Sequence, residues 1–378
     1  MALDHYYTLG RSGLRVSRMA LGTMTFGNAA IRGISGSWGS ADEISGAIFD
    51  HYTDMGGNFI DTANSYGAGA SESLIGQFMR EKGNRERLVL ATKYSNSLEP
   101  GNPNAGGNSR KAMMRAVEDS LRRLGTDYID LYMVHTWDRI TPAEEVVRTL
   151  DDLVRAGKIR YGGLSDVPAW YAARAQTWAE CHALTPLISL QLPYSLAERN
   201  IEQEFVPLAQ NMGLGITVWS PLSMGLLSGK YRVEGDRWAG EGRLTTDASG
   251  KGMGLFTARN HAILSALQDV AAELERPMAQ VALSWVLNRP SVASLIIGAS
   301  KLAQLQDNIA AFELQIPAEL SARLDAASAL PSPQPYALFD ADYQAGVLNT
   351  GTSVGDKPAS YAPPQWMPKV DDFTYGKG

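Results

Sequence analysis

The sequence has a single cysteine, Cys181, among its 378 residues. One thiol cannot form an internal disulfide, and it cannot supply the cysteine ligands of a zinc or iron–sulfur site. The disulfide-stabilised domains of secreted proteins and cysteine-based metal centres are therefore excluded, and no metal is expected.

Long apolar runs and an excess of basic charge are also missing. The first ten residues, MALDHYYTLG, contain no apolar run of signal-peptide length, and no stretch of the sequence is long enough to span a bilayer. The 34 Lys and Arg residues against 40 Asp and Glu residues give a net charge of −6, which favours neither nucleic acid nor an anionic membrane as a partner. We therefore expect a cytoplasmic globular protein without nucleic-acid or membrane partners.

What the sequence does contain is a series of short apolar segments rich in β-branched residues. Near-continuous apolar runs are typical of strands buried on both faces of a sheet. Amphipathic stretches lie between them; residues 109–124, for example, carry Met113, Val117 and Leu121 at helical spacing, and Gly125 follows as the stop. The eight predicted strands are SRMALGT (17–23), NFIDTA (58–63), RLVLATKY (87–94), YIDLYMVHT (128–136), KIRYGGLSD (158–166), LISLQLPYS (187–195), GITVWSPL (215–222) and ASLIIGAS (293–300).

The spacing of these segments predicts the fold. Successive strands mostly begin about 30 to 40 residues apart, which is the length of one strand and its return helix. Eight such units in sequence predict an α/β fold, a (β/α)8 barrel of the TIM type over residues 1–330. The gap before the last strand is much longer and leaves room for a long loop at 229–258 and an extra helix.

Two further segments lie outside the repeating units. YYTLGRSGLRVS, at 6–17, is typical of a β-hairpin with a glycine-containing turn, and we expect it to cap the bottom of the barrel. Residues 331–378 contain seven of the eighteen prolines and seven aromatic residues, and they form a predicted irregular C-terminal extension. Because disordered tails are usually poor in aromatic residues, we expect part of this tail to dock on the barrel or on a partner subunit. A homo-oligomer is left open.

Active sites of such barrels lie at the carboxyl ends of the strands, so the residues that close each strand are the first candidates. The second predicted strand brings Asp61 to this end, the third Lys93 and the fourth His135, while Tyr66 follows Asp61 by five residues. Taken singly, three of them have a structural interpretation: a rim charge for Lys93, packing for Tyr66, and a helix cap or loop residue for Asp61. Their convergence on one rim favours a catalytic site.

The four side chains have complementary chemistry. An ammonium beside a phenol favours the phenolate, so Lys93 is expected to lower the pKa of Tyr66. Asp61 can supply the counter-charge that a buried lysine needs, and His135 can donate a hydrogen bond to a carbonyl oxygen. The set suits protonation of an oxygen while a hydride reaches the attached carbon.

These residues lie in segments that resemble the aldo-keto reductases, which are NAD(P)H-dependent barrel enzymes. GNFIDTANSYG with SESLIG resembles the signature around the catalytic Asp and Tyr, LVLATKY the lysine segment and LYMVHTWD the histidine segment. The resemblance covers roughly residues 5–328. It implies that Tyr66 is the general acid/base, that Lys93 and Asp61 tune it, and that His135 positions the carbonyl. WSPL with GKY is most similar to the subgroup of potassium-channel β-subunits, aryl-alcohol dehydrogenases and sugar or sugar-phosphate reductases.

The same resemblance implies a nicotinamide-cofactor site. GLSD (163–166) is similar to the family's G-x-S-N, which holds the nicotinamide carboxamide; Asp166 in place of Asn keeps an acceptor and loses a donor. Lys301 beside Ser300 favours the 2′-phosphate of NADP(H) over NAD(H). No G-x-G-x-x-G joins a strand to a helix, so a Rossmann domain is not indicated. The residues that the resemblance assigns to the cofactor are Gly22, Thr23, Met24, Asp61, Ser165, Asp166, Gln191, Trp219, Ser220, Leu222, Lys230, Arg243, Gly298, Ser300, Lys301, Gln304, Asp307 and Asn308.

Substrate choice is expected to come from the loops. The first strand-to-helix loop, GNAAIRGISGSWGS, is rich in Gly and Ser and carries Trp38, and Trp137 flanks the histidine segment. With Tyr66 and His135, these are the predicted substrate contacts, although both tryptophans can equally serve to pack the loops. Such a lining suits an aromatic, polycyclic or otherwise bulky carbonyl better than a small charged one.

The predicted function is the reversible NADPH-dependent reduction of an aldehyde or ketone, with a small-molecule carbonyl or alcohol as the partner. Two alternatives stay open. One is a regulatory or redox-sensing subunit that binds NADPH tightly and turns over slowly. The other is a Schiff-base lyase that uses Lys93, against which the cofactor segments argue.

Overall fold

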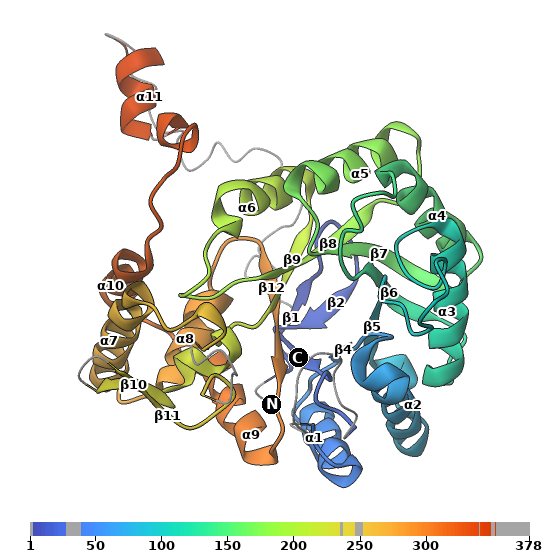
Figure 1. Cartoon of the computed structure of the whole chain (residues 1–378), viewed down its shortest axis with the longest axis horizontal. Helices are drawn as coiled ribbons and strands as arrows, with labels where there is room; N and C mark the ends of the chain where they lie inside the picture. The colour runs from blue at the N-terminus through green and yellow to red at the C-terminus, as the bar shows by residue number, and fades with distance from the viewer. Residues whose placement is uncertain are drawn as a thin grey trace, which may run out of the picture. The chain divides into compact units, whose positions relative to one another are not determined.

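The computed structural model describes residues 3–27, 39–234, 237–245, 252–339, 341–348 and 352. Eight parallel strands close into a barrel in the order β12-β3-β4-β5-β6-β7-β8-β9 (Figure 1). Each lies within one residue of its predicted segment, so the predicted barrel is confirmed. The strands are β3 (Met19–Gly22), β4 (Phe59–Asp61), β5 (Val89–Tyr94), β6 (Ile129–Val134), β7 (Ile159–Ser165), β8 (Leu187–Pro193), β9 (Gly215–Trp219) and β12 (Val292–Gly298).

Helices surround the barrel (Figure 1), and their ends follow from local sequence. In α3, the Oγ of Ser109 accepts a hydrogen bond from the N–H of Ala112 at 3.4 Å, which satisfies a free donor of the first turn. Gly125 ends α3 with a left-handed φ of 63°, which glycine adopts without strain. The α-helices of this part are α1 (Asp42–Asp54), α2 (Ala70–Lys82), α3 (Arg110–Leu124), α4 (Ala143–Arg155), α5 (Ala169–Cys181), α6 (Ile201–Met212), α7 (Ala258–Glu273), α8 (Met278–Leu287), α9 (Leu302–Ile309) and α10 (Ala318–Ser328).

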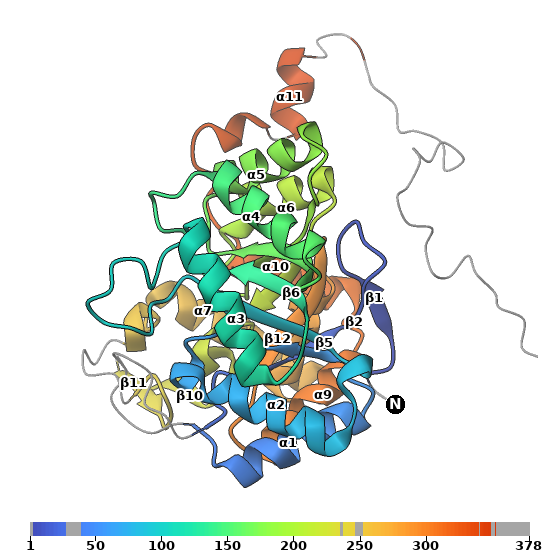
Figure 2. The same cartoon turned by 90° about the vertical axis from the view of Figure 1, so that its right-hand side faces the viewer.

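The N-terminal hairpin caps one end of the barrel, as predicted. β1 (Tyr6–Thr8) pairs antiparallel with β2 (Arg15–Ser17). Leu9 and Val16 are fully buried among the side chains that fill the barrel interior. Figure 2 shows this hairpin at one end of the barrel, so the opposite end is the open one.

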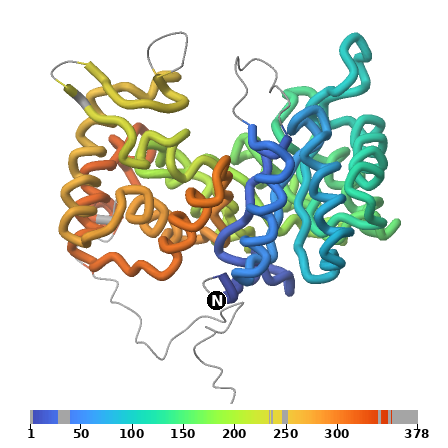
Figure 3. The backbone as a smooth tube through the Cα atoms, turned by 90° about the horizontal axis from the view of Figure 1, so that it is seen from below, coloured from blue at the N-terminus to red at the C-terminus, as the bar shows by residue number. Residues whose placement is uncertain are grey.

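The insertion between β9 and β12 contains more regular structure than the sequence indicated. Its described residues include the α-helices α7 and α8, of which α8 packs against β12 and α7 is the expected extra helix. The predicted loop before α7 also contains a second hairpin, β10 (Tyr231–Glu234) with β11 (Arg237–Gly240). Figures 2 and 3 show this hairpin at the end of the barrel opposite to the N-terminal hairpin. The prediction of a long loop at 229–258 is therefore wrong for the residues of this hairpin.

The chain divides into two compact units, Met1–Ala329 and Leu330–Gly378. The second unit contains a short 3₁₀ helix, η6 (Tyr336–Phe339), and the helix α11 (Ala341–Leu348). The predicted irregular extension thus contains two short helical elements among its described residues. Docking of this tail stays a prediction. None of the described helices is both long enough and apolar enough to cross a membrane.

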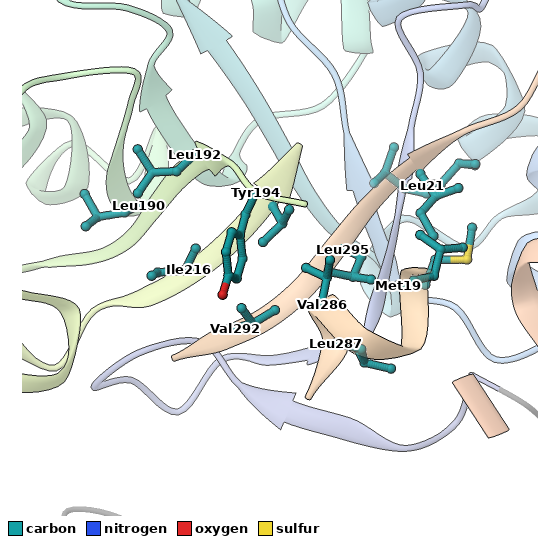
Figure 4. Packing of buried hydrophobic residues seen from close by; sticks show 14 of the residues in the cluster. Met19, Leu21, Leu190, Leu192, Tyr194, Ile216, Val286, Leu287, Val292 and Leu295 are labelled. Carbon is teal, nitrogen blue, oxygen red and sulfur yellow. The ribbon is translucent and has the colours of Figure 1, made fainter. Parts of the chain in front are cut away.

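Side chains of the barrel strands alternate between two hydrophobic layers. The outward layer packs against the helices, as Figure 4 shows for Leu295 of β12 beside Val286 and Leu287 of α8. Because side chains alternate along a strand, the remaining positions point into the barrel. The inward layer includes Ala20, Phe59, Val89, Ala91, Leu131, Met133, Ile188 and Ile296.

The buried hydroxyl of Tyr52 connects α1 to the first two barrel strands and to β2. It accepts a hydrogen bond from the N–H of Phe59 at 2.9 Å. It also lies 2.7 Å from the carbonyl oxygen of Met19 and 2.8 Å from the Oγ of Ser17. One hydroxyl thus satisfies polar groups on three segments that have no access to water.

We expect Tyr52→Phe to lower the free energy of unfolding by about 2 kcal/mol, because it leaves buried backbone groups unpaired. Tyr6→Phe is the matched control, since the Tyr6 hydroxyl also bonds to a carbonyl, that of Gly56 at 2.9 Å, but at an exposed position. For Tyr6→Phe we expect the free energy of unfolding to fall by only about 0.5 kcal/mol. Urea unfolding measures the free energy of unfolding of both variants. Equal decreases in the two variants would contradict the importance of burial at Tyr52.

Candidate active site

Inward-facing residues at the carboxyl ends of the strands form a ring at the open end of the barrel. Lys93 follows Ala91 at the two-residue interval that keeps side chains on one face of β5, and His135, one residue beyond β6, follows Met133 in the same way. The alternation of the strands therefore delivers these polar groups to one place. The ring consists of Gly22, Asp61, Lys93, His135, Ser165, Gln191, Trp219 and Gly298.

Asp61 and Lys93 form a buried ion pair in this ring. The Nζ of Lys93 lies 2.7 Å from Oδ1 of Asp61 and 2.9 Å from the carbonyl oxygen of Thr62. Neither charged side chain is more than 2% exposed. Burial alone lowers the pKa of Lys93, but Asp61 and Tyr66 raise it above its ordinary value, so Lys93 stays protonated. The Nε2 of Gln191 donates to the other carboxylate oxygen at 2.8 Å, which holds Asp61 from a second side.

Tyr66 reaches the ion pair from the short helix η1 (Tyr66–Gly69) after β4. Its hydroxyl lies 3.4 Å from the Nζ of Lys93. Burial raises the pKa of Tyr66, and the charge of Lys93 lowers it by less, so the pKa is above its ordinary value. The expected lowering is therefore wrong for the net shift, because removing a phenolate from water outweighs the attraction of one ammonium. The free phenol is protonated at neutral pH.

His135 faces Tyr66 edge-on, with the ring centroids 5.8 Å apart. Its backbone N–H bonds to the carbonyl oxygen of Tyr94 at 3.1 Å and to the Oγ of Ser95 at 3.0 Å, which anchors it beside the end of β5. Burial and the positive charge of Lys93 lower the pKa of His135 to about 3. The imidazole is therefore neutral at physiological pH and carries a single N–H.

A cavity of about 680 Å³ opens over this cluster. Its volume falls within the range of small-molecule binding sites. Lys93 is not among the lining residues; it lies behind them, in contact with Asp61 and Tyr66. The predicted site residues that line the cavity are Gly22, Thr23, Met24, Asp61, Tyr66, His135, Ser165, Asp166, Gln191, Trp219, Ser220, Leu222, Lys230, Arg243, Gly298, Gln304, Asp307 and Asn308.

Two predicted cofactor residues stand just outside this lining. The N–H and Oγ of Ser300 both bond to Oε1 of Gln304, at 3.1 and 3.2 Å, so Ser300 shapes the turn that leads into α9. Lys301 is exposed at the residue that precedes α9. Both are thus neighbours of Gln304, which does line the cavity.

Of the two tryptophans predicted to contact the substrate, the structure describes only Trp137. Trp137 does not line the cavity; its ring packs against Trp170 and Tyr171, with centroids 5.7 and 6.2 Å away. This is the loop-packing interpretation of that residue. Trp38 lies outside the described residues.

Asp166 and Trp219 form part of the cavity wall. Asp166 has a left-handed φ of 47°, a conformation that Asp and Asn adopt more readily than most residues. Its Oδ1 accepts a hydrogen bond from Nε1 of Trp219 at 3.0 Å. Burial raises the pKa of Asp166 by more than the bonds from Trp219 and Ser165 and the charge of Lys93 lower it. The sequence showed that Asp166 replaces the Asn of the family's G-x-S-N, but it did not indicate the hydrogen bond to Trp219.

Several lining residues were not found from the sequence. Gln280 is buried near the start of α8, and its Nε2 donates to the carbonyl oxygen of Asp307 at 3.0 Å. Its Oε1 has no partner among the described residues. A search among the residues that close the barrel strands cannot find Gln280, because it lies on a helix. The sequence does indicate the start of that helix, since Pro277 directly before α8 is typical of such a position. The other residues missed are Thr25, Pro221, Met224, Gly225, Ser228, Pro277, Ala279, Ile296 and Ile297.

The low pKa of His135 predicts a pH-dependent contribution to stability. In the unfolded chain a histidine binds a proton below about pH 6.5, whereas folded His135 binds one only near pH 3. Folding must release that proton, so stability falls as the pH drops below about 6.5. Between about pH 7.5 and 5.5 we expect the wild type to lose about 1.4 kcal/mol more than His135→Gln.

Urea unfolding at the two pH values measures this difference. His182→Gln is the control, because it removes an exposed imidazole at the end of α5, and it should follow the wild type. The same pH dependence in His135→Gln as in the wild type would mean that the folded chain protonates His135 as easily as the unfolded one does.

Comparisons with known proteins identify the family. The chain matches the Aldo/keto reductase family over residues 18–329. It is 38% identical to the uncharacterized oxidoreductase YrpG of Bacillus subtilis, over 83% of this chain and 93% of that protein. It is 34% identical to norsolorinic acid reductase B of Dothistroma septosporum (82% and 78% covered) and 32% identical to the NADP(+) aryl-alcohol dehydrogenase of Phanerodontia chrysosporium (93% and 92% covered). The chain therefore belongs to the aldo/keto reductase family of NAD(P)H-dependent oxidoreductases.

Proposed function

We propose that this oxidoreductase reduces an aldehyde or ketone to the alcohol with NADPH, reversibly, and that Tyr66 donates the proton. The observation that carries the proposal is the cluster of Tyr66, Lys93, Asp61 and His135 beneath a cavity of about 680 Å³. A phenol and a neutral imidazole that converge there can protonate and orient one carbonyl oxygen.

The protonation state of each group supports this assignment. The raised pKa of Tyr66 keeps its proton available at neutral pH. After transfer to the carbonyl oxygen, the phenolate is left 3.4 Å from the ammonium of Lys93, whose charge stabilises it. Asp61 keeps Lys93 charged and in place. In the reverse direction the same phenolate accepts the proton of the alcohol.

His135 acts on the same oxygen as a hydrogen-bond donor. Its imidazole is neutral, so it contributes one N–H and no charge. A donor that is already in place stabilises the negative charge that develops on the oxygen without reorganisation. His135 thereby sets the orientation of the carbonyl relative to the Tyr66 hydroxyl.

The cavity has the donors and acceptors that a phosphate-bearing dinucleotide requires. Lys230 lines it and can pair with the pyrophosphate, beside Ser220 and Leu222, and Arg243 is a second basic residue of the lining. The buried, unpartnered Oε1 of Gln280 is an acceptor that an N–H of such a ligand can satisfy. NADPH supplies the hydride that reduces the carbonyl carbon.

Two sets of residues would hold the ends of the cofactor. Ser165, Asp166 and Gln191 would hold the nicotinamide carboxamide, and Trp219 would stack near the ring. Gly22, Thr23 and Met24 would lie beside it. The adenosine end would be held by Gly298, Ser300, Lys301, Gln304, Asp307 and Asn308.

The preference for NADP(H) over NAD(H) rests on Lys301 and Arg243. A 2′-phosphate adds negative charge that NAD(H) lacks, and basic side chains near the adenosine end favour it. One relative of the chain is named for NADP(+), which supports the same preference.

We further propose that the substrate is an aromatic, polycyclic or otherwise bulky carbonyl. Apolar side chains of Met24, Trp219, Leu222 and Met224 line the cavity. Relatives carry the names aryl-alcohol dehydrogenase and norsolorinic acid reductase, which supports this class. Trp38 stays a predicted contact.

The test is NADPH oxidation, followed at its absorbance, across aryl aldehydes, sugars and polycyclic ketones, with the alcohols and NADP⁺ for the reverse reaction. Rapid turnover of a bulky aryl carbonyl is expected. Tight NADPH binding without steady turnover on any carbonyl would instead favour the regulatory, redox-sensing subunit.

Tyr66→Phe tests the proton donor. Removing the hydroxyl should lower kcat by about 100-fold or more, because the general acid is lost, while NADPH binding, measured by fluorescence titration, persists. Tyr6→Phe, in the hairpin at the other end of the barrel, is the matched control and should keep wild-type turnover. Near-normal turnover of Tyr66→Phe would refute its assignment as the acid.

Lys301→Ala tests the cofactor preference. Loss of a charged hydrogen bond to the 2′-phosphate should raise the Kd of NADPH by about 10-fold or more and leave that of NADH nearly unchanged. Lys230→Ala is the contrasting variant, because the pyrophosphate is common to both cofactors; it should weaken NADPH and NADH by similar factors. If Lys301→Ala weakens both equally, Lys301 does not select the 2′-phosphate.

A further inference from the structure

The side chain of Asn96 contacts the ring of His135 and has no role in the reaction proposed above. Asn96 lies two residues after β5 and His135 one residue after β6, and the parallel register of these strands brings them together. The Nδ2 of Asn96 lies 3.3 Å from Nδ1 of His135 and 3.1 Å from the Oγ of Ser65. An amide nitrogen only donates, so in this arrangement Nδ1 of His135 is the acceptor.

We propose that Asn96 is a positioning residue that holds neutral His135 in the tautomer with its proton on Nε2. A neutral imidazole has one proton, and the hydrogen bond at one nitrogen decides which nitrogen carries it. With Nδ1 accepting from Asn96, Nε2 carries the hydrogen and can donate it to a carbonyl oxygen. The opposite tautomer would turn a lone pair toward that oxygen. The inference rests on the proposed role of His135 in carbonyl reduction.

The surroundings of His135 favour a neutral imidazole over a charged one. The ammonium of Lys93 and the phenol of Tyr66 are the titratable groups that face the ring from β5 and η1. The ammonium disfavours a second proton on the imidazole. A donor on Nδ1 disfavours it further, because a protonated imidazole has no acceptor to offer Asn96.

The backbone at Ser95 ties Asn96 to His135. Ser95 has a φ of 103°, a region that L-residues rarely adopt and that persists only where its surroundings hold it. Its carbonyl oxygen accepts from the N–H of Gly107 at 2.8 Å, and its Oγ bonds to Oδ1 of Asn108 at 2.6 Å. The same Oγ accepts from the N–H of His135. A strained residue with these partners sets where Asn96, the next residue, meets the imidazole.

The tautomer can be read directly by NMR. Nitrogen-15 labelling of histidine with long-range proton–nitrogen correlation distinguishes protonated from bare ring nitrogens, and His135→Gln assigns the signal among the five histidines. We expect the proton on Nε2 in the wild type. In Asn96→Asp the carboxylate accepts from Nδ1, so the proton should move there. A wild type with its proton on Nδ1, or an Asn96→Asp variant that keeps it on Nε2, overturns the inference.

The pH profile of kcat is the second measurement. Near pH 8, Asn96→Asp should be slower than the wild type by about 100-fold, because the donor to the developing oxyanion is lost. As the pH falls, the new carboxylate favours the doubly protonated imidazole, which regains an N–H on Nε2. The rate relative to the wild type should then rise by up to about 10-fold per pH unit. A loss that is the same at every pH would indicate packing alone and overturn the inference.

Asn104→Asp is the matched control. It adds the same charge to the same loop at an exposed position and should keep the wild-type tautomer and pH profile. If Asn96→Asp does not fold, the spectrum of the wild type still decides. A wild type with its proton on Nε2 that reduces no carbonyl would overturn the proposed function and leave the tautomer inference standing.

Discussion

The buried pair of Asp61 and Lys93 is the interaction on which the mouth of this barrel depends. Two charges with almost no access to water persist only while each compensates the other, and removing one leaves a strongly destabilising charge behind. Gln191 and the carbonyl of Thr62 complete the shell around the pair. The ammonium of Lys93 also affects two neighbouring groups. It opposes the effect of burial on the pKa of Tyr66 and helps to lower the pKa of His135.

The charge of Lys93 thus influences the protonation states of both Tyr66 and His135. At neutral pH the lysine is charged, the phenol is protonated and the imidazole is neutral. Each group is in the state that carbonyl reduction would need at its start. The arrangement requires burial as well as charge, because a solvated ammonium at the same distance would be screened and would shift its neighbours much less.

The architecture and the polar ring could be predicted from the sequence because both follow from periodicity. Apolar runs mark the strands, and the two-residue alternation brings Lys93 and His135 to the same interior as the core residues before them. The net pKa of Tyr66 could not be predicted, because it depends on burial by residues distant in sequence. Gln280 and Asn96 were missed for a related reason: an amide has no recognisable chemistry until its neighbours are known. Trp137, a predicted substrate contact, packs against Trp170 and does not line the cavity, because a position beside His135 does not determine where a ring points.

The closure of the barrel has a consequence for how the chain is made. β3 pairs on one side with β12, and the Oγ of Ser294 bonds to the carbonyl oxygen of Ser17 at 2.8 Å. During synthesis at about 5 to 20 residues per second, roughly 15 to 55 s separate Gly22 from Gly298. For that interval one edge of β3 has no native partner, and an open strand edge invites pairing with other chains. The native barrel can therefore close only after its last strand has been synthesised.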